Sequence, residues 1–294
     1  MELITTHGLR MPRLGLGTGL LRDAPGQASM ELALSLGFRH LDTAEMYTNE
    51  GTVGAAIAAS GVPRGEIHIT TKMLPEHMEP TELRRSMERS LTALRTNYVD
   101  LYLIHWHMTG MDLGATLGEM TRLQAEGCAR VIGVCNFNVA LLRQAVEVIG
   151  APIACNQIEY HVLLDQSAVL RYARSKGIAV IAYAPLARGR FLASPEMQRI
   201  ARKHGASPAQ VGLKWLLDQE SVAAIPRAGR RESLLENLSA VRLELDGDDH
   251  AAIARLPKNE RVVNVDFAPV WDVPEADECA ASSYAEQLPE GPPR

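Results

Sequence analysis

Eight short apolar segments alternate with longer segments of helical periodicity over most of this chain. The apolar segments are rich in Val, Ile and Leu and have the length of buried strands. Strands that alternate with helices are typical of a parallel sheet, and eight such units favour a closed barrel over an open sheet. We therefore predict an α/β fold, a (β/α)8 TIM barrel, with strands over residues 14–17, 39–42, 67–71, 99–104, 131–134, 153–157, 178–183 and 222–225.

Helical periodicity predicts the connections between these strands. The expected helices cover residues 28–36, 54–59, 80–94, 141–148, 167–175, 208–217 and 231–238. Gly37 and Gly177 follow two of them, where a glycine commonly ends a helix. A longer loop over residues 184–194 and an extra helix near 195–204 interrupt the alternation. At the N-terminus, LITT followed by THGLRMPRLG predicts a β-hairpin that plugs the barrel floor.

The domain organisation follows from length and composition. A (β/α)8 barrel typically takes about 250 residues, and no linker or solenoid-length repeat divides the 294 residues. Residues 1–272 are therefore expected to form one barrel domain. Residues 273–294 are rich in Pro, Glu, Ser and Ala, which predicts a flexible acidic C-terminal tail.

Charge and composition narrow the class of partner and the compartment. The net charge is -5 and no run of Lys or Arg occurs, which argues against a nucleic-acid partner. The 4 cysteines form no CxxC pair and fit free thiols in a reducing compartment. Neither a signal-peptide layout nor a run of 18 apolar residues is present, so we expect a cytoplasmic protein that does not bind membranes. Without a heptad run or a long apolar edge, a monomer is expected.

Four chemically active side chains stand at or just after the ends of predicted strands. They are Asp42, Tyr47, Lys72 and His105. The carboxyl ends of parallel strands are where α/β enzymes place their chemistry. A neighbouring ammonium lowers the pKa of a phenol from about 10. We therefore predict a proton-donating site with Tyr47 as the acid, Lys72 as the group that lowers its pKa, Asp42 as the anchor of the lysine and a neutral His105 as a second donor.

Each residue also has an ordinary structural interpretation. An Asp after a strand is often a helix N-cap, an isolated Tyr or Lys is usually solvated, and a His at a strand end is usually structural. His105 and His107 form an HxH pair that points to one face of a strand, a spacing that suits zinc. No third ligand stands at a suitable strand end, so we predict no metal site.

The segments that carry these residues resemble a known family. LDTAEMYTNEGTVG, IHITTKM and VDLYLIHWH are similar to the catalytic tetrad segments of the aldo-keto reductases. The resemblance covers roughly residues 10–272. NYVDLYLIHW and NERVVNVDFAPVWD are most similar to bacterial enzymes of the diketogluconate reductase and methylglyoxal reductase type. The resemblance implies that the protein reduces aldehydes, small α-dicarbonyl compounds and keto-sugar acids to alcohols, with Tyr47 as the proton donor.

The second half of the chain resembles the nicotinamide-nucleotide site of that family. In VIGVCNFNVALL, Cys135 replaces the usual serine and is a weaker hydrogen-bonding group. The resemblance implies that Asn136 and Gln157 bind the carboxamide and that Tyr183 stacks on the nicotinamide ring. It also implies contacts with the pyrophosphate and the adenine from Leu186, Arg188, Glu236 and Asn237.

Coenzyme choice depends on two further segments. GLGTG at residues 15–19 lacks the third glycine of a dinucleotide fingerprint, so we interpret it as a tight turn in which Gly17 and Thr18 approach the ribose. IPRAGRRESLLEN resembles the adenosine-phosphate segment of the family. The resemblance implies that Arg227 keeps the charge that grips a ribose phosphate and that Arg230 and Arg231 can replace a missing arginine. We expect NADPH as the cofactor, with NADH as the alternative.

The substrate pocket is expected to be open. The family often places aromatic residues after the first and third strands, where this chain has Gly19 and Leu74. The remaining wall is predicted to contain Trp106, His107 and Trp271, which favours a broad range of small aldehydes over flat steroids. Two alternatives stay open: a nucleotide-binding sensor with little turnover, and a metal-dependent barrel hydrolase.

Overall fold

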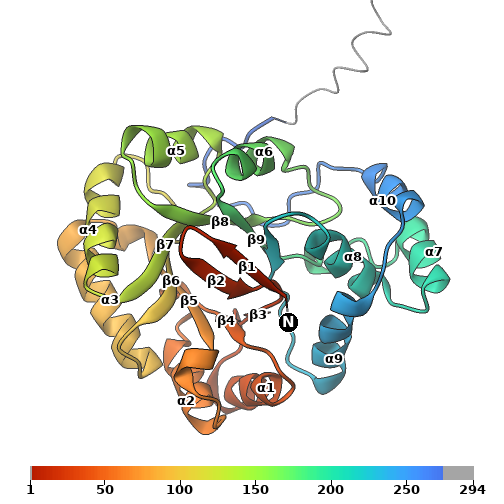
Figure 1. Cartoon of the computed structure of the whole chain (residues 1–294), viewed down its shortest axis with the longest axis horizontal. Coiled ribbons are helices and arrows are strands. Elements are labelled where there is room, and N and C mark those ends of the chain that lie inside the picture. Colours follow the sequence, from red (N-terminus) through yellow and green to blue (C-terminus); the bar gives the residue numbers. More distant parts are fainter. Residues whose placement is uncertain (1, 274–294) are drawn as a thin grey trace, which may run out of the picture.

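A computed structural model describes residues 2–273 of the chain. Its core is a sheet of eight parallel strands that are arranged in chain order, from β3 to β10. An isolated parallel bridge between Leu14 and Ala224 joins the two ends of the sheet, where the Gly15 amide donates to the Ala224 carbonyl at 2.9 Å. The sheet is therefore closed into a ring surrounded by helices (Figure 1), and the predicted (β/α)8 barrel is confirmed.

Short strands and longer helices make up the described residues. The strands are β1 (Leu3–Thr6), β2 (Leu9–Pro12), β3 (Leu16–Gly17), β4 (His40–Asp42), β5 (His68–Met73), β6 (Val99–Ile104), β7 (Ala129–Cys135), β8 (Ile153–Glu159), β9 (Ala179–Tyr183) and β10 (Val222–Ala224). The α-helices are α1 (Asp23–Ser35), α2 (Glu50–Ala59), α3 (Pro80–Leu94), α4 (Leu113–Ala125), α5 (Val139–Arg143), α6 (Ser167–Ser175), α7 (Pro195–Lys203), α8 (Pro208–Leu217), α9 (Arg231–Ser239) and α10 (Gly247–Ala254). Shorter helical turns are η1 (Glu45–Tyr47), η2 (Arg64–Glu66), η3 (Pro75–His77), η4 (Gln144–Val148), η5 (Ala187–Gly189) and η6 (Ala240–Arg242).

The predicted elements are present, but several bounds differ. β3 contains only Leu16–Gly17, because Leu14 pairs with Ala224 as an isolated bridge. The helix expected over residues 141–148 is divided into α5 and η4, which is a π-helical turn. The extra helix expected near 195–204 is α7. The tail predicted for residues 273–294 lies, apart from Val273, outside the described residues, so the domain boundary stays a prediction.

Two helices, α4 and α10, are missing from the sequence prediction. Gly114 and Gly118 lower the helix propensity of the α4 segment. α4 forms nevertheless, because the Asp112 side chain caps its first turn and one side of the helix is buried. Asp246 is the N-cap of α10 and forms a reciprocal capping box with Asp249. Caps and buried side chains therefore stabilise these two helices, since the apolar periodicity of their sequences is weak.

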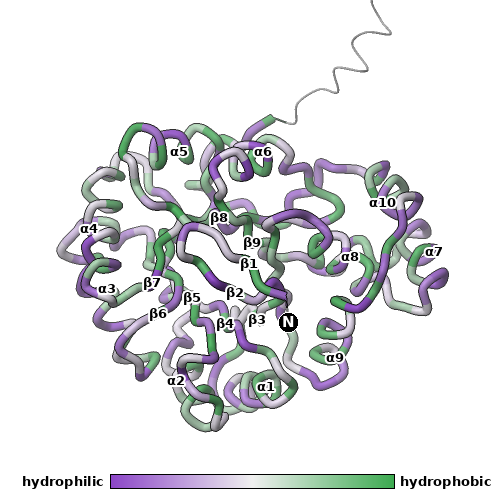
Figure 2. The backbone as a smooth tube through the Cα atoms, viewed as in Figure 1, coloured by the Kyte–Doolittle hydropathy of each residue, from purple (hydrophilic) through white to green (hydrophobic). Residues whose placement is uncertain are grey.

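Outer helices pack against the barrel with one side only. α3 buries Leu83, Met87 and Leu94 and leaves Arg85 and Glu88 exposed. Figure 2 shows hydrophobic and hydrophilic residues alternating along the outer helices, as this arrangement requires.

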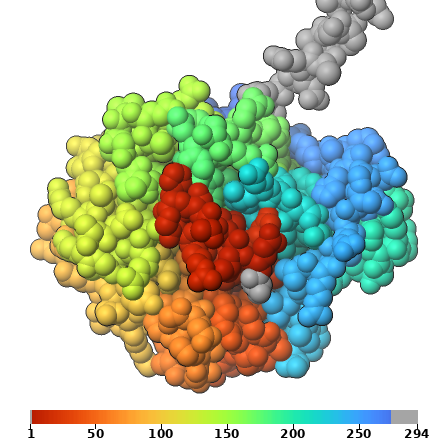
Figure 3. Space-filling view, viewed as in Figure 1, coloured from red at the N-terminus to blue at the C-terminus, as the bar shows by residue number. Residues whose placement is uncertain are grey.

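The hairpin of β1 and β2 covers one end of the barrel. Its strands are antiparallel, with Leu3 opposite Pro12. Ile4, Leu9 and Met11 pack in one apolar cluster with side chains from barrel strands. Figures 1 and 3 show the hairpin lying across the centre of the ring. The predicted β-hairpin that closes this end of the barrel is confirmed. A substrate could therefore reach the barrel only from its opposite end.

Two buried histidines, His40 and His68, meet where β4 and β5 begin. Their ring centroids are 4.8 Å apart and the rings are nearly perpendicular. Burial, together with the nearby charges of His68 and Lys72, holds the pKa of His40 well below its ordinary value. Burial also lowers the pKa of His68 to about 4. Both rings are therefore neutral at pH 7.

Acidification should destabilise the protein through this pair. The unfolded chain binds a proton on His68 near pH 6.5 and the folded chain only near pH 4, so stability falls as the pH decreases through this window. The His68 contribution should be roughly 2 kcal/mol between pH 7 and pH 5. Urea titrations at both pH values measure it, and a His68→Asn variant should lose less stability than the wild type. Equal losses would contradict the assignment.

Candidate active site

Asp42 and Lys72 form a buried ion pair on the neighbouring strands β4 and β5. Lys72 Nζ donates to Asp42 Oδ1 at 2.5 Å and to the Thr43 carbonyl at 2.6 Å. Neither charged side chain is more than 1% exposed. Burial lowers the pKa of Lys72, but the Asp42 carboxylate, Tyr47 and Cys135 together raise that pKa above its ordinary value, so the lysine stays charged.

Tyr47 and His105 lie beside this pair. Lys72 Nζ is 5.1 Å from the centroid of the Tyr47 ring. The His105 ring centroid is 5.7 Å from the Tyr47 ring centroid, and the two rings are nearly perpendicular. The four side chains predicted as a catalytic group are therefore gathered at one place, although they come from separate strands and from η1.

Two opposing effects set the pKa of Tyr47. Burial raises the pKa of Tyr47, and the opposing effect of the Lys72 ammonium does not cancel it. Lys72 lowers the pKa of this phenol, as expected, but burial raises that pKa by more, so Tyr47 keeps its proton at neutral pH. Burial and the charge of Lys72 hold the pKa of His105 well below its ordinary value, so its imidazole is neutral.

Residues predicted to bind the nicotinamide surround the same place. Gln157 Nε2 donates to Asp42 Oδ2 at 2.7 Å. The Tyr183 hydroxyl donates to Asn136 Oδ1 at 2.8 Å, and Asn136 Nδ2 donates to the His105 carbonyl at 3.1 Å. Gln157, Asn136 and Tyr183 are thus linked by hydrogen bonds to the four predicted catalytic residues.

Glu45, which the sequence analysis missed, holds the turn that carries Tyr47. Its carboxylate accepts hydrogen bonds from the Leu74 amide at 3.1 Å and from Ser86 Oγ at 2.6 Å. His77 Nδ1 lies 3.0 Å from the same carboxylate. These partners belong to the segment after β5 and to α3, so η1 is tied to elements that follow Glu45 by 29 to 41 residues along the chain. No local sequence signal distinguishes this glutamate from a surface residue.

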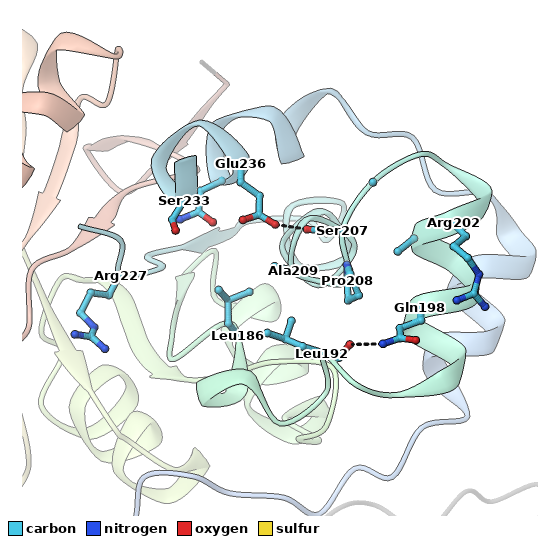
Figure 4. A pocket seen from close by; sticks show the side chains of 13 residues that line it. Leu186, Leu192, Gln198, Arg202, Ser207, Pro208, Ala209, Arg227, Ser233 and Glu236 are labelled. Atoms are coloured by element: carbon cyan, nitrogen blue, oxygen red, sulfur yellow. Dashed lines mark hydrogen bonds between the residues drawn. The ribbon is translucent and has the colours of Figure 1, made fainter. Parts of the chain in front are cut away.

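A cavity of about 500 Å³ opens between the loop after β9 and the helices α7, α8 and α9 (Figure 4). Its lining contains four of the predicted nucleotide-binding residues: Leu186, Arg227, Glu236 and Asn237. Ser207 donates a hydrogen bond to the Glu236 carboxylate. Arg188 and Arg230 are exposed and do not line this cavity. The catalytic group does not line it either, so the cavity suits the distal end of a long ligand.

The loop at the mouth of this cavity has an unusual backbone. Ala184, Ala187 and Arg188 adopt φ values of 46°, 47° and 51°, in the left-handed region that side chains rarely occupy. Such conformations persist only where the surrounding structure imposes them, and they are common at ligand sites.

Gly17 and Thr18 have clear structural roles. A Cβ atom on Gly17 would lie 2.7 Å from the Ile225 carbonyl oxygen, so closure of the barrel at β3 requires glycine. Thr18 is fully buried, and its hydroxyl donates to the Asp42 carbonyl at 2.9 Å. A contact between Thr18 and a ribose stays a prediction.

Aromatic side chains form a wall beside His105. The Trp106 ring centroid lies 5.8 Å from that of Phe267 and 6.2 Å from that of Trp271. The His107 ring packs 6.0 Å from the Phe137 ring. Phe267 was not predicted, because it belongs to an irregular C-terminal segment without periodicity.

The described residues contain neither a candidate metal site nor a candidate membrane-spanning helix. Within residues 2–273, no three His, Cys, Asp or Glu side chains are grouped closely enough to hold a metal ion. His105 and His107 therefore have no third protein ligand in that range. No helix there is both long and apolar enough to cross a membrane.

Comparisons with known proteins agree with this geometry. The model of the Aldo/keto reductase family matches residues 13–258. The chain is 43% identical to methylglyoxal reductase DkgB of Escherichia coli O157:H7 over 268 residues, which is 90% of this chain and 100% of that protein. It is 39% identical to an aldo-keto reductase of Mycolicibacterium smegmatis over 254 residues, 85% of this chain and 89% of that protein.

Solved structures agree as well. A protein assigned as a 2,5-diketo-D-gluconic acid reductase B superposes with a TM-score of 0.89 at 36% identity, and the match covers 93% of this chain and 98% of that one. The aldose reductase of Schistosoma japonicum superposes with a TM-score of 0.86 at 31% identity, covering 92% of this chain and 98% of that one. The chain therefore belongs to the aldo/keto reductase family, and it is an oxidoreductase that uses NAD(P)H.

Proposed function

We propose that this protein reduces aldehydes and small α-dicarbonyl compounds such as methylglyoxal to alcohols, with NADPH as the cofactor. Keto-sugar acids are included in the proposed range. The observation that supports it most is the grouping of Tyr47 and His105 around the buried Asp42–Lys72 pair. The DkgB relatives are methylglyoxal reductases, which points to the same substrate class.

Tyr47 is the proposed proton donor. A carbonyl that accepts a hydride becomes an alkoxide unless a proton arrives with it. Tyr47 has the proton to give, because burial raises its pKa. Lys72, kept charged by Asp42, stabilises the phenolate that remains after the transfer. The neutral His105 donates a hydrogen bond to the carbonyl oxygen and orients it.

The bound nicotinamide nucleotide supplies the hydride. The residues available to hold it are Asn136, Gln157 and Tyr183 near the catalytic group, and Glu236 and Asn237 in the cavity between α8 and α9. The strained loop over residues 184–189 lies between these two groups in the sequence and adjoins the cavity through Leu186. The residues present therefore fit a dinucleotide.

Arg227 should set the preference for NADPH. Its exposed guanidinium lies at the edge of the cavity (Figure 4), where it can bind a ribose phosphate through paired hydrogen bonds. Arg227→Ala should weaken NADPH binding by about 10- to 100-fold and leave NADH binding unchanged. Quenching of tryptophan fluorescence measures both affinities. Comparable catalytic efficiency of the wild type with NADH and NADPH would contradict the proposed cofactor.

The pocket should accept many small aldehydes. A Cβ atom on Gly19 would lie 3.8 Å from the Tyr47 ring, so an aromatic residue at position 19 would cover the catalytic phenol. Because position 19 is a glycine, small aldehydes can approach the Tyr47 hydroxyl without this obstacle.

Turnover with the purified protein tests the function directly. Loss of the absorbance of NADPH after addition of methylglyoxal is the expected result. Binding of NADPH without turnover of any small aldehyde would select the sensor alternative. Steroid reduction that exceeds methylglyoxal reduction would contradict the open pocket.

Glu45 should matter for turnover through the position of Tyr47. Glu45→Ala removes the contacts of η1 with Leu74 and Ser86 and should lower kcat by about 10- to 100-fold, because small displacements of a catalytic group are costly. NADPH affinity should not change. Glu45→Gln keeps an acceptor oxygen and should recover part of kcat. If Glu45→Ala keeps the wild-type kcat, the hydrogen bonds of Glu45 are not needed to position Tyr47.

A further inference from the structure

A buried carboxylate at the end of β8 holds the segment that follows α10. The Glu159 side chain is fully buried, and its two oxygens accept hydrogen bonds from consecutive backbone amides, Val262 at 2.6 Å and Val263 at 2.8 Å. His161 Nε2 is a third partner at 2.9 Å. The Leu163 amide donates to His161 Nδ1 at 3.3 Å, so Nε2 carries the hydrogen that is directed at the carboxylate. Three donors therefore converge on one buried carboxylate.

We call residues 262–272, the segment held in this way, the C-terminal strap. Its far end is fixed just before and at the start of α5. There, Asp272 Oδ2 accepts from the Val139 amide at 3.0 Å, and Asn138 Nδ2 donates to the Val270 carbonyl at 2.9 Å. The strap is therefore anchored at both ends, at one end by the last residue of β8 and at the other by the segment that follows β7.

Between its anchors the strap carries two rings of the aromatic wall. Phe267 and Trp271 both pack against Trp106, which directly follows His105. Trp271 Nε1 donates to Asn264 Oδ1 at 3.1 Å, so the two halves of the strap are also joined to each other. Phe267 is 42% exposed and Trp106 only 4%, so the strap supplies ring surface that a substrate can reach.

We propose that Glu159 is a positioning residue for the substrate: by fixing the C-terminal strap it places Phe267 and Trp271, and it thereby sets a preference for aldehydes that carry a ring. The inference rests on the proposed carbonyl reduction. Contacts between aromatic rings require centroids between about 4.5 and 7 Å apart, so even a modest displacement of the strap weakens them. Glu159 itself acts on the substrate only through the strap.

Propanal and hydrocinnamaldehyde test the proposal, because the second compound is propanal with a phenyl ring on its terminal carbon. In the wild type, KM for hydrocinnamaldehyde should be lower than KM for propanal by on the order of 10-fold. Glu159→Gln keeps the size of the side chain but offers one acceptor oxygen in place of two, so a buried donor loses its partner. This variant should raise KM for hydrocinnamaldehyde by about 5- to 10-fold. Kinetics with propanal and the affinity for NADPH should not change.

Glu119→Gln is the matched control for the loss of a buried carboxylate. The Glu119 side chain is 5% exposed, and it pairs with Arg84 of α3 and Arg122 of α4, which lie outside the strap. This variant should keep both wild-type KM values. If Glu159→Gln raises KM for the two aldehydes equally, or weakens NADPH binding, then Glu159 supports the barrel as a whole and the proposal is overturned.

The opposite anchor provides a variant that leaves the buried carboxylate intact. Asp272→Ala removes the acceptor of the Val139 amide and should also raise KM for hydrocinnamaldehyde without affecting propanal. If it keeps the wild-type KM for hydrocinnamaldehyde, the proposal is overturned, whether or not Glu159→Gln folds. A wild type that binds NADPH but reduces neither aldehyde contradicts the proposed function itself. Reduction of both aldehydes with equal KM contradicts only the role of Glu159.

Discussion

Tyr47→Phe should lower kcat for methylglyoxal by about 1000-fold, within the range that general acid catalysis contributes. The substitution removes one oxygen and keeps the ring that lies 5.1 Å from Lys72 and 5.7 Å from His105. Without the hydroxyl, the developing alkoxide has no proton donor of suitable position. Single-turnover measurements of NADPH oxidation with saturating methylglyoxal give the size of the loss.

The same variant should bind NADPH with unchanged affinity, because no proposed nucleotide contact involves the phenol hydroxyl. Tyr98→Phe is the matched control, since Tyr98 packs between Arg64 and Arg130 just before β6, at the end of that strand away from His105. Its kcat should equal that of the wild type. Retained turnover in Tyr47→Phe would refute the assignment of the proton donor.

Lys72→Met should reduce the free energy of unfolding by about 3–5 kcal/mol, the usual cost of leaving one partner of a buried ion pair unpaired. The Asp42 carboxylate is 1% exposed and, among the described residues, would keep only the Gln157 amide as a side-chain donor. The variant should also lose carbonyl reduction, because the phenolate of Tyr47 would lack its cation. Urea unfolding at pH 7 measures the change in stability.

The double variant Asp42→Leu/Lys72→Met separates the charge effect from packing. Removing both charges leaves no unpaired ion, so this protein should be more stable than Lys72→Met alone. A loss below about 1 kcal/mol in Lys72→Met would mean that water or a neighbouring group compensates Asp42. The pair would then not be the structural anchor inferred here.

The barrel and the grouping of the four predicted catalytic residues were predictable because both depend on local patterns. Eight alternations of strand and helix indicate a closed parallel sheet, and strand ends of such a sheet meet at one rim. Asp42, Lys72 and His105 therefore had to lie near one another once the strands were placed. The predicted grouping with Tyr47 is what the structure contains.

Contacts between distant segments were not predictable in this way. Glu45 binds residues of the β5–α3 connection, and Phe267 reaches Trp106 from the C-terminal segment. Neither residue stands in a periodic element, so no pattern marks it. The helices α4 and α10 were missed for a related reason, because caps and burial stabilise them more than periodicity does.

The amino-acid sequence alone determined the closed barrel, its hairpin floor and the set of polar side chains at its rim, since alternation and apolar content are encoded locally. Tertiary structure alone decided the protonation of these side chains. Burial outweighs the Lys72 charge in setting the pKa of Tyr47. This outcome depends on how much water the folded chain excludes, and this depends on packing between residues far apart in the sequence.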